Sequence, residues 1–331
     1  MTGLEDLELL DRGRHIARAL AAVLPPDFGR AAPILTASLG PVLDSTEDNG
    51  MSVFEYLPHS YYVADYGLEH FEAAMQFQYQ LTQRFTAEFS IRPYLQRYPE
   101  ASLERLHSWV EDPSAHVRRL VSEGTRTRLP WAGRLPQFQR DPQPVLALLE
   151  RLRDDPSLYV RRSVANNLND ISKDNPDAAL AVCERWMQDA SAQRRWIVEH
   201  ALRVQIKRGD ARALAVLGFG GPQRLDVAGR CTPRRARIGG SVLLEAELHH
   251  AGRKPLRAVA DFVVHFVKAN GTTAPKVFKG SELELGPDEH AQVRKTISLR
   301  QHTTRTHYAG VHRVQLRVNG RDYPLGSFTL A

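Results

Sequence analysis

Two carboxylates stand among closely spaced arginines in the middle of the chain. Glu123 lies in VRRLVSEGTRTRLPW (117–131), and Asp170 lies in VANNLNDISKD (164–174). Such carboxylates are often ordinary surface ion pairs that contribute little to stability. If the arginines bind phosphates, however, a carboxylate repels that ligand and is tolerated mainly where it meets a cation. A cationic N-alkylated base, or the oxocarbenium-like sugar formed as that base leaves, is such a partner.

Three tryptophans fall in the same region, where an aromatic ring would add cation–π attraction of about 0.5–2 kcal/mol. Trp186 follows the apolar pattern of an inner helix face, which predicts a core position. Trp131 and Trp196 are predicted at the surface, although a single tryptophan more often serves packing.

A weak internal repeat provides the elements that would position these residues. Asp-Pro-Ser at 112–114 and at 155–157 each precede a similar string, HVRRLVSE and YVRRSVAN, and Asp189 begins a looser third copy. The aspartates are 43 and 34 residues apart, which is in the range of helical-pair solenoids. We expect each Asp to cap a helix and each Pro to take its first position. An amphipathic helix precedes each Asp, so each unit reads as helix, turn, helix.

The repeat allows the second helices to be superposed. Val121, Val164 and Val198 share one register position and predict a buried stripe, and Leu168 and Leu202 match one turn later, where the first copy has a threonine. A second stripe follows another face in all three copies, and it contains Arg119, Glu123 and Arg126; Arg162, Asn166, Asn169 and Lys173; and Trp196, His200, Arg203 and Lys207. In a solenoid these positions line one surface, which would suit a phosphate backbone. A merely solvated face remains the alternative.

Helical periodicity covers residues 1–220, whereas residues 221–331 show alternating, valine-rich segments with Asn-Gly and Gly-Pro turns. The change falls in LGFGGPQ (217–223). We therefore predict a mainly α protein: a HEAT-like helical-repeat solenoid followed by a C-terminal all-β immunoglobulin-like sandwich.

The net charge of +6 is unevenly distributed. Residues 1–100 carry −7, residues 101–220 carry +4 and residues 221–331 carry +9. A basic middle and C-terminal part is typical of a polyanion binder, although only 7 of the 44 basic residues are lysine and an arginine bias also follows from genome composition.

Several classes of protein are disfavoured. Cys183 and Cys231 are far apart, and the histidines show no metal-ligand spacing, so we expect neither a disulfide scaffold nor a metal site. Phosphate-loop and dinucleotide fingerprints are missing, so no cofactor is expected. The acidic N-terminus and the lack of a long apolar run predict no signal peptide, no membrane partner and a cytoplasmic location.

The strings 117–131, YVRRSVANNLNDISKDNP (159–176) and RRWIVEHALRVQIKRGD (194–210) resemble the AlkC-type DNA alkylation repair glycosylases, HEAT-like-repeat relatives of the AlkD enzymes. The C-terminal part, through GVHRVQLRVNG (310–320) and its strand pattern, resembles the immunoglobulin-like domain of one AlkC subgroup.

The resemblance implies a monofunctional N-glycosylase in base excision repair. Its partner would be double-stranded DNA with cationic alkylated bases, namely 3-methyladenine and 3-methylcytosine, with 1-methyladenine as a further candidate. It would act in the bacterial cytoplasm, associated with the nucleoid. The family is understood to work without flipping the base into a deep pocket, unlike most enzymes that modify bases.

The resemblance also implies roles for individual residues. Glu123 and Asp170 would stabilise the oxocarbenium and orient water, and Trp131 or Trp196 would pack on the lesion or sugar. The predicted DNA-binding residues are Arg119, Arg126, Arg128, Arg162, Asn166, Asn167, Lys173, Arg195, Trp196, His200, Arg203 and Lys207. Basic turns at 234–237, 253–254 and 301–305 would add contacts from the β part.

Two other readings stay open. A non-catalytic HEAT-repeat scaffold for nucleic acid would show nearly the same basic residues, and a protein-interaction solenoid would carry them merely as surface. Release of a methylated base from alkylated DNA would distinguish the glycosylase from both of these alternatives.

Overall fold

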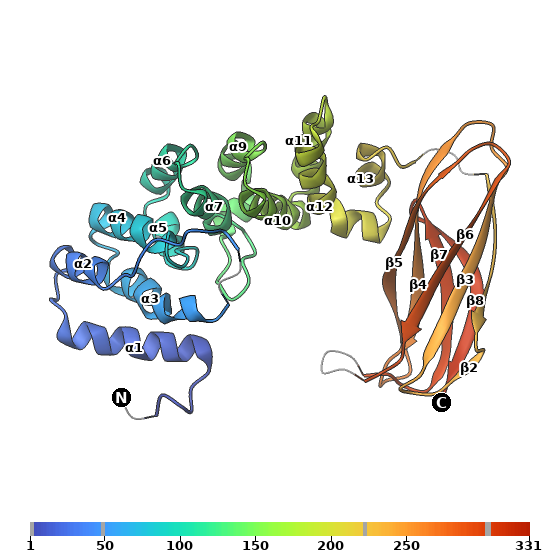
Figure 1. The fold of residues 1–331 in the computed structure, drawn as a ribbon, viewed down its shortest axis with the longest axis horizontal. Helices are drawn as coiled ribbons and strands as arrows, with labels where there is room; N and C mark the ends of the chain where they lie inside the picture. Colours follow the sequence, from blue (N-terminus) through green and yellow to red (C-terminus); the bar gives the residue numbers. More distant parts are fainter. Residues whose placement is uncertain (1–2, 48–49, 221–223, 302–305) are drawn as a thin grey trace. The chain divides into compact units, whose positions relative to one another are not determined.

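The structure, a computed structural model, describes residues 3–47, 50–220, 224–301 and 306–331, and it divides into two compact units, Met1–Ala201 and Leu202–Ala331 (Figure 1). The first unit is helical. Its elements are α1 (Leu9–Val23), α2 (Phe28–Ala37), the 3₁₀ helix η1 (Ser52–Tyr56), α3 (Leu57–Tyr66), α4 (Phe71–Thr82), α5 (Ile91–Arg97), α6 (Pro99–Trp109), α7 (Ala115–Gly124), α8 (Pro136–Arg140), α9 (Gln143–Leu152), α10 (Leu158–Asp174), α11 (Pro176–Met187) and the first part of α12 (Ala192–Arg208).

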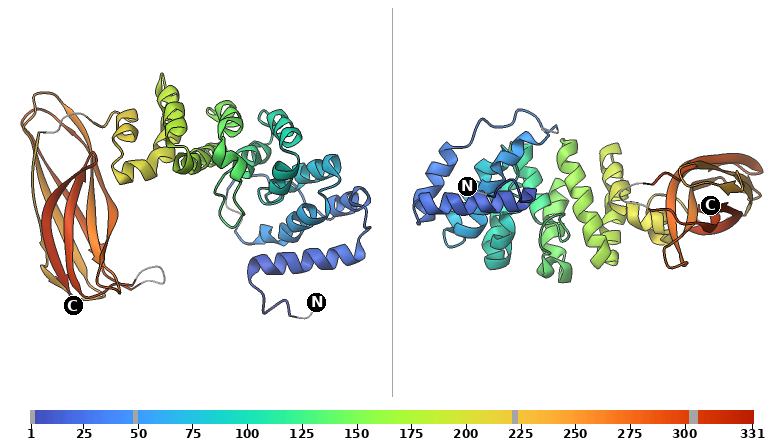
Figure 2. Two further views of the ribbon diagram at one scale, coloured as in Figure 1. Left: turned by 180° about the vertical axis from the view of Figure 1, so that it is seen from behind. Right: turned by 90° about the horizontal axis from the view of Figure 1, so that it is seen from below.

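The predicted helix pairs are present as α6 with α7 and α9 with α10, followed by α11 and α12. Within the first unit α6 and α9 lie in one row and α7 and α10 in a second row beside it (Figures 1 and 2). The predicted buried stripe is confirmed, because Val121, Val164 and Val198 are all fully buried. Trp186 is also buried, at 1% exposure, as predicted. The assignment of these pairs to the HEAT type stays a prediction.

The starts of α7 and α10 differ from the prediction. Ser114 and Ser157, not the aspartates, occupy the N-cap positions, so each proline precedes the helix instead of opening it. Each aspartate instead accepts a hydrogen bond from the backbone N–H of the serine two residues later, at 2.8 Å in both copies. Asp side chains favour this local turn because their short carboxylate reaches the backbone two residues on.

A buried ion pair joins successive repeats. Arg118 on α7 donates through Nε and Nη2 to the carboxylate of Asp155, at 2.6 and 3.1 Å. The side chain of Asp155 is only 3% exposed. Asp155 thus orders its own turn before α10 and binds the preceding repeat, which fixes α10 against α7.

Among its described residues, the second unit contains the rest of α12, α13 (Ala211–Val216) and eight strands. The strands are β1 (Leu225–Thr232), β2 (Arg235–Ala236), β3 (Ser241–His250), β4 (Leu256–Val267), β5 (Thr273–Leu285), β6 (Glu289–Ser298), β7 (Gly310–Val318) and β8 (Arg321–Leu330). They form a sheet of order β1-β3-β6 and a sheet of order β2-β8-β7-β4-β5.

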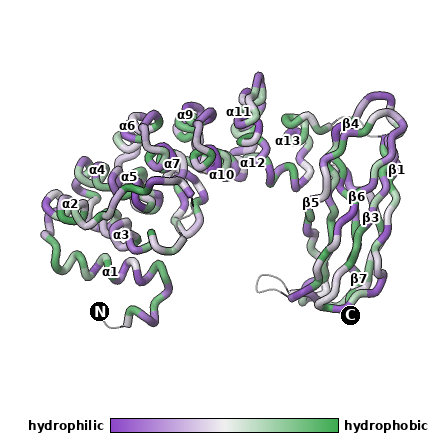
Figure 3. Tube along the Cα trace, in the orientation of Figure 1, coloured by the Kyte–Doolittle hydropathy of each residue, from purple (hydrophilic) through white to green (hydrophobic). Residues whose placement is uncertain are grey.

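The core of the β part consists of alternate residues of these strands. Along β3, for example, Val242, Leu244, Ala246 and Leu248 are buried at 1% exposure or less. This period of two buries one face of an antiparallel strand and leaves the other toward solvent. Figure 3 shows the strands changing between hydrophilic and hydrophobic along their length. The predicted change from helices to a β-rich C-terminal part is confirmed.

The domain boundary at 220/221 was placed by composition. The last helix ends at Val216 and the first strand begins at Leu225, while the division between the compact units falls earlier, at 201/202 within α12. The boundary therefore stays a prediction. Of the basic turn at 301–305, residues 302–305 lie outside the described residues.

The Arg118–Asp155 pair predicts a stability effect. We expect Asp155→Ala to lower the free energy of unfolding by about 2–3 kcal/mol, because it leaves a largely buried guanidinium without its carboxylate. Glu111→Ala, which removes an exposed partner of Arg151, should stay within about 0.5 kcal/mol of wild type. Urea unfolding followed by circular dichroism measures both, and equal effects would contradict the structural role of the pair.

Candidate functional site

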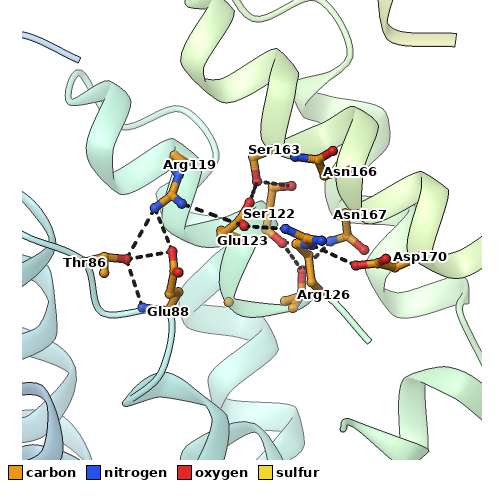
Figure 4. A network of polar contacts seen from close by, with 12 residues as sticks. Thr86, Glu88, Arg119, Ser122, Glu123, Arg126, Ser163, Asn166, Asn167 and Asp170 are labelled. Atoms are coloured by element: carbon orange, nitrogen blue, oxygen red, sulfur yellow. Dashed lines mark hydrogen bonds and ion pairs between the residues drawn. The ribbon is translucent and has the colours of Figure 1, made fainter. Parts of the chain in front are cut away.

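The two predicted catalytic carboxylates come together through one arginine. Arg126 donates through Nη1 to Glu123 Oε1 at 2.6 Å and through Nε to Asp170 Oδ2 at 2.8 Å (Figure 4). Glu123 lies at the end of α7 and Asp170 lies on α10, so this guanidinium links the two helices. The side chains of Glu123 and Asp170 are only 7% and 3% exposed.

Glu123 has further partners on both sides. Ser163 on α10 donates its hydroxyl to Oε2 at 2.5 Å, and Arg119 lies 3.7 Å from Oε1. Arg119 also pairs with Glu88 at 2.8 Å (Figure 4). Its guanidinium stacks over the ring of Tyr159 at 4.9 Å. Residues from three separate segments therefore fix the orientation of the Glu123 carboxylate.

These charges determine the ionisation of Glu123. Burial alone would raise its pKa, but the guanidinium groups of Arg119 and Arg126 and the hydrogen bond from Ser163 hold the pKa below the ordinary value. Burial would likewise lower the pKa of Arg126, yet Glu123 and Asp170 raise it. Glu123 is therefore an ionised carboxylate beside a charged arginine at neutral pH.

Asp170 and its neighbours on α10 are also engaged. Lys173 donates to Asp170 Oδ1 at 2.8 Å from the exposed side of the helix. Asn167 donates to the Ser122 carbonyl at 2.7 Å and is fully buried. Asn169, also buried, donates to the Ala201 carbonyl at 2.6 Å.

Burial changes the interpretation of the predicted stripe. An open basic face was expected, but Arg126 and Asn169 are at most 9% exposed and Arg119 pairs with two glutamates. These residues are therefore placed to hold the carboxylates and the helices together rather than to meet a phosphate. Helical register alone does not show that the next repeat covers this part of α7.

Trp131 stands apart from this network and is 66% exposed. Its φ of +63° lies in the left-handed region, which a bulky residue rarely adopts. Such strain costs about 1–3 kcal/mol and persists only where the surroundings enforce it. The surface position predicted for Trp131 is thus confirmed, and its backbone is held in a special conformation.

The other predicted binding residues are distributed as follows. Arg162, Lys173 and Arg195 are exposed. Arg128 pairs with Asp174, its Nε lying 2.9 Å from Oδ2. Trp196 stacks on His200 with ring centroids 5.1 Å apart, and His200 Nε2 lies 3.3 Å from the Asn166 side-chain oxygen. Arg203 and Lys207 are exposed on the part of α12 that belongs to the second unit.

Sequence reasoning missed several members of the site. Glu88, Ser163 and Tyr159 all contact the Glu123–Arg119 side of the network. Ser163 follows a stripe arginine directly and its position could have been found by superposing the repeats. Glu88 lies outside the repeats, in the acidic front of the chain, and no sequence signal connects it to Arg119.

The structure was also compared with the requirements of a metal site and of a membrane-spanning helix. Among the described residues no group of three or more His, Cys, Asp or Glu side chains is arranged to hold a metal ion. No helix within the described ranges is long and apolar enough to cross a membrane.

The fold and the site define a class: a helical protein with a buried carboxylate–arginine–carboxylate group, followed by a β-rich part. Residues 82–204 match the family described as DNA alkylation repair enzyme, and residues 227–331 match the C-terminal Ig-like domain of the uncharacterised protein YhaZ. The chain is 36% identical to YhaZ of Bacillus subtilis strain 168 over 316 residues, which span 95% of this chain and 85% of YhaZ.

The fold also matches a solved structure. It is similar to Pseudomonas fluorescens alkylpurine DNA glycosylase AlkC bound to DNA containing an abasic site analog, with a TM-score of 0.89 and 37% identity over 99% of this chain and 89% of that one. The chain therefore belongs to the DNA alkylation repair enzyme family, in its AlkC-type branch with a C-terminal Ig-like domain.

The lowered pKa of Glu123 predicts a pH dependence of stability. Because its folded pKa lies below the unfolded value of about 4.5, the ionised carboxylate stabilises the protein above that pH and loses this effect as the pH falls through the folded pKa. The stability advantage of wild type over Glu123→Gln should therefore shrink as the pH falls below about 4.5.

Urea unfolding at several pH values measures this difference. Glu111→Gln, at an exposed carboxylate, serves as the matched control and should follow wild type throughout. A difference between wild type and Glu123→Gln that is constant with pH would show that Glu123 is not held ionised by its arginines.

Proposed function

We propose that the protein is a monofunctional DNA glycosylase that hydrolyses the N-glycosidic bond of cationic alkylated bases. The observation that carries the proposal is the pair of buried carboxylates on α7 and α10 held by Arg126. The similarity of the chain, over nearly its full length, to an alkylpurine DNA glycosylase supports the same conclusion.

The chemistry needs little from the protein, because a cationic base is already a good leaving group. The C1′–N bond breaks with its electron pair going to the base, which neutralises the positive charge of the base. The sugar then carries an oxocarbenium-like charge that Glu123 and Asp170 would stabilise. A water adds to C1′ and gives up a proton, and one of the two carboxylates would orient that water.

The small exposed fractions of both carboxylates suit this role. In a site with little solvent, a fixed charge is worth more than in bulk water. We propose that the lesion is attacked without being flipped into a deep pocket, as the family resemblance implies. Trp131, exposed beyond the network, would pack on the lesion or sugar.

Double-stranded DNA is the proposed partner. AlkC was solved with DNA containing an abasic site analog, which supports this partner for the present chain. Arg162, Lys173 and Arg195 are exposed and basic, so they are suited to phosphate oxygens. Arg128, Asn166, Trp196, His200, Arg203 and Lys207 remain proposed DNA contacts, whereas Arg119, Arg126 and Asn167 are reassigned to support of the carboxylates.

The proposal also includes the type of repeat, the bounds of the domains and the identity of the lesions. The helix pairs would be HEAT-like repeats, the domains would be 1–220 and 221–331, and the lesions would be 3-methyladenine, 3-methylcytosine and 1-methyladenine. A DNA repair activity of this kind would operate beside the nucleoid in the bacterial cytoplasm.

Single-turnover release of 3-methyladenine from methylated duplex DNA tests the function. We expect Glu123→Gln and Asp170→Asn each to slow release about 100-fold or more, because each removes a charge that stabilises the transition state. Glu111→Gln, remote and exposed, should release base at the wild-type rate.

Two outcomes would contradict the proposal. If both carboxylate variants keep the wild-type rate, the catalytic assignment is wrong. If folded wild type binds DNA but releases no base, the non-catalytic scaffold is the correct reading.

A further inference from the structure

Arg92, on α5, holds three backbone carbonyls and lies outside the carboxylate network. It is 4% exposed. Its Nη1 donates to the carbonyls of Gly124 at 3.1 Å and Arg126 at 2.8 Å, and its Nη2 donates to the carbonyl of Gly133 at 2.5 Å. One guanidinium therefore binds both ends of the segment between α7 and α8.

The carbonyls that Arg92 binds lie close in sequence to Glu123 and to Trp131. Gly124 is the last residue of α7, where carbonyls lack a partner within the helix and the helix dipole favours a cation. Glu123 is the residue before it. Gly133 lies two residues after Trp131, whose backbone has a positive φ. Arg92 thus binds the backbone next to Glu123 and the backbone next to Trp131 with the same rigid group.

Burial of the Arg92 guanidinium costs free energy, which its hydrogen bonds must offset. Burial, with the positive charge of Arg126 nearby, lowers the pKa of Arg92 to about 10. Among the described residues no carboxylate lies within ion-pair distance of its guanidinium. A buried cation without an ion pair persists where hydrogen bonds compensate it, and here the carbonyls of this one segment supply those bonds. The nearby carboxylates of Glu88 and Asp170 also favour the charged form of Arg92.

The surroundings of Trp131 leave room for movement. A cavity of about 250 Å³ lies against this segment, and its lining includes Tyr61, Phe89, Arg92 and Trp131. Trp131 is 66% exposed and lines this pocket, so side-chain packing restrains it only in part. Two hydrogen bonds hold its turn: the Ala132 N–H donates to the Leu129 carbonyl at 3.3 Å, and Arg92 donates to the Gly133 carbonyl.

We propose that Arg92 is a positioning residue that fixes Trp131 relative to Glu123 by holding the backbone shortly after each of them. This inference rests on the proposed glycosylase function, and it adds to it a residue from the acidic N-terminal helices. Arg92 touches neither substrate nor reacting atoms, and it acts through the Trp131 segment.

The test combines kinetics with a readout independent of activity. Arg92→Gln should slow single-turnover release of 3-methyladenine about 10- to 100-fold, since a small misplacement of a positioned group has effects of this size. Arg92→Lys keeps the charge and part of the bonding and should recover part of the rate. In a Trp131→Ala background, Arg92→Gln should cause little further loss. Hydrogen exchange of the amides in 125–133 should accelerate in Arg92→Gln.

Arg84→Gln is the matched control, because Arg84 also donates to backbone carbonyls, those of Gly40 and Gln80, away from the site. It should leave both release and exchange of 125–133 unchanged. Arg92→Gln that behaves like Arg84→Gln in both measurements overturns the inference. An equal rate loss with and without Trp131 overturns the claim that Arg92 acts through Trp131.

The two proposals fail in different ways. An inactive but folded wild type contradicts the glycosylase function. In that case the exchange measurement alone decides the role of Arg92: unchanged exchange in Arg92→Gln overturns it, and faster exchange confined to 125–133 supports it.

Discussion

The ion pairs from Arg126 to Glu123 and Asp170 are the interaction on which the site depends. Two carboxylates buried at the junction of α7 and α10 would repel each other and resist ionisation without a shared cation. Arg126 lies between them, attracts both carboxylates and ties their positions to each other. The same bonds join consecutive repeats, so the site and the packing of these helices cannot be separated.

Supporting contacts surround this group. Ser163 donates to Glu123, Asn167 donates to the Ser122 carbonyl, and Arg118 reaches Asp155 across the same helix interface. Polar contacts of this kind add little net stability compared with apolar packing, but they require one register of α10 against α7. We infer that the polar interface serves to place the carboxylates, while the fully buried Val121 and Val164 supply the hydrophobic contact.

Much of this organisation follows from the sequence, and its limits have physical reasons. Periodicity predicted the helix pairs, the buried valines and the change to strands, because each depends on residues close in the sequence. The carboxylates were singled out by their chemistry among arginines and by a family resemblance. The bridge by Arg126 was missed because register gives the face of a residue but not the depth at which the next repeat covers it. Arg92 and Glu88 were missed because they reach the site from helices and loops without repeat signals.

The most direct test of the central claim removes Arg126 and leaves both carboxylates in place. Single-turnover release of 3-methyladenine is measured for Arg126→Met, a substitution of similar length without charge, with folding checked by circular dichroism. The account predicts a rate about 100-fold or more below wild type, comparable with the loss of one preorganised charged group. A folded Arg126→Met protein that releases base at the wild-type rate would contradict it.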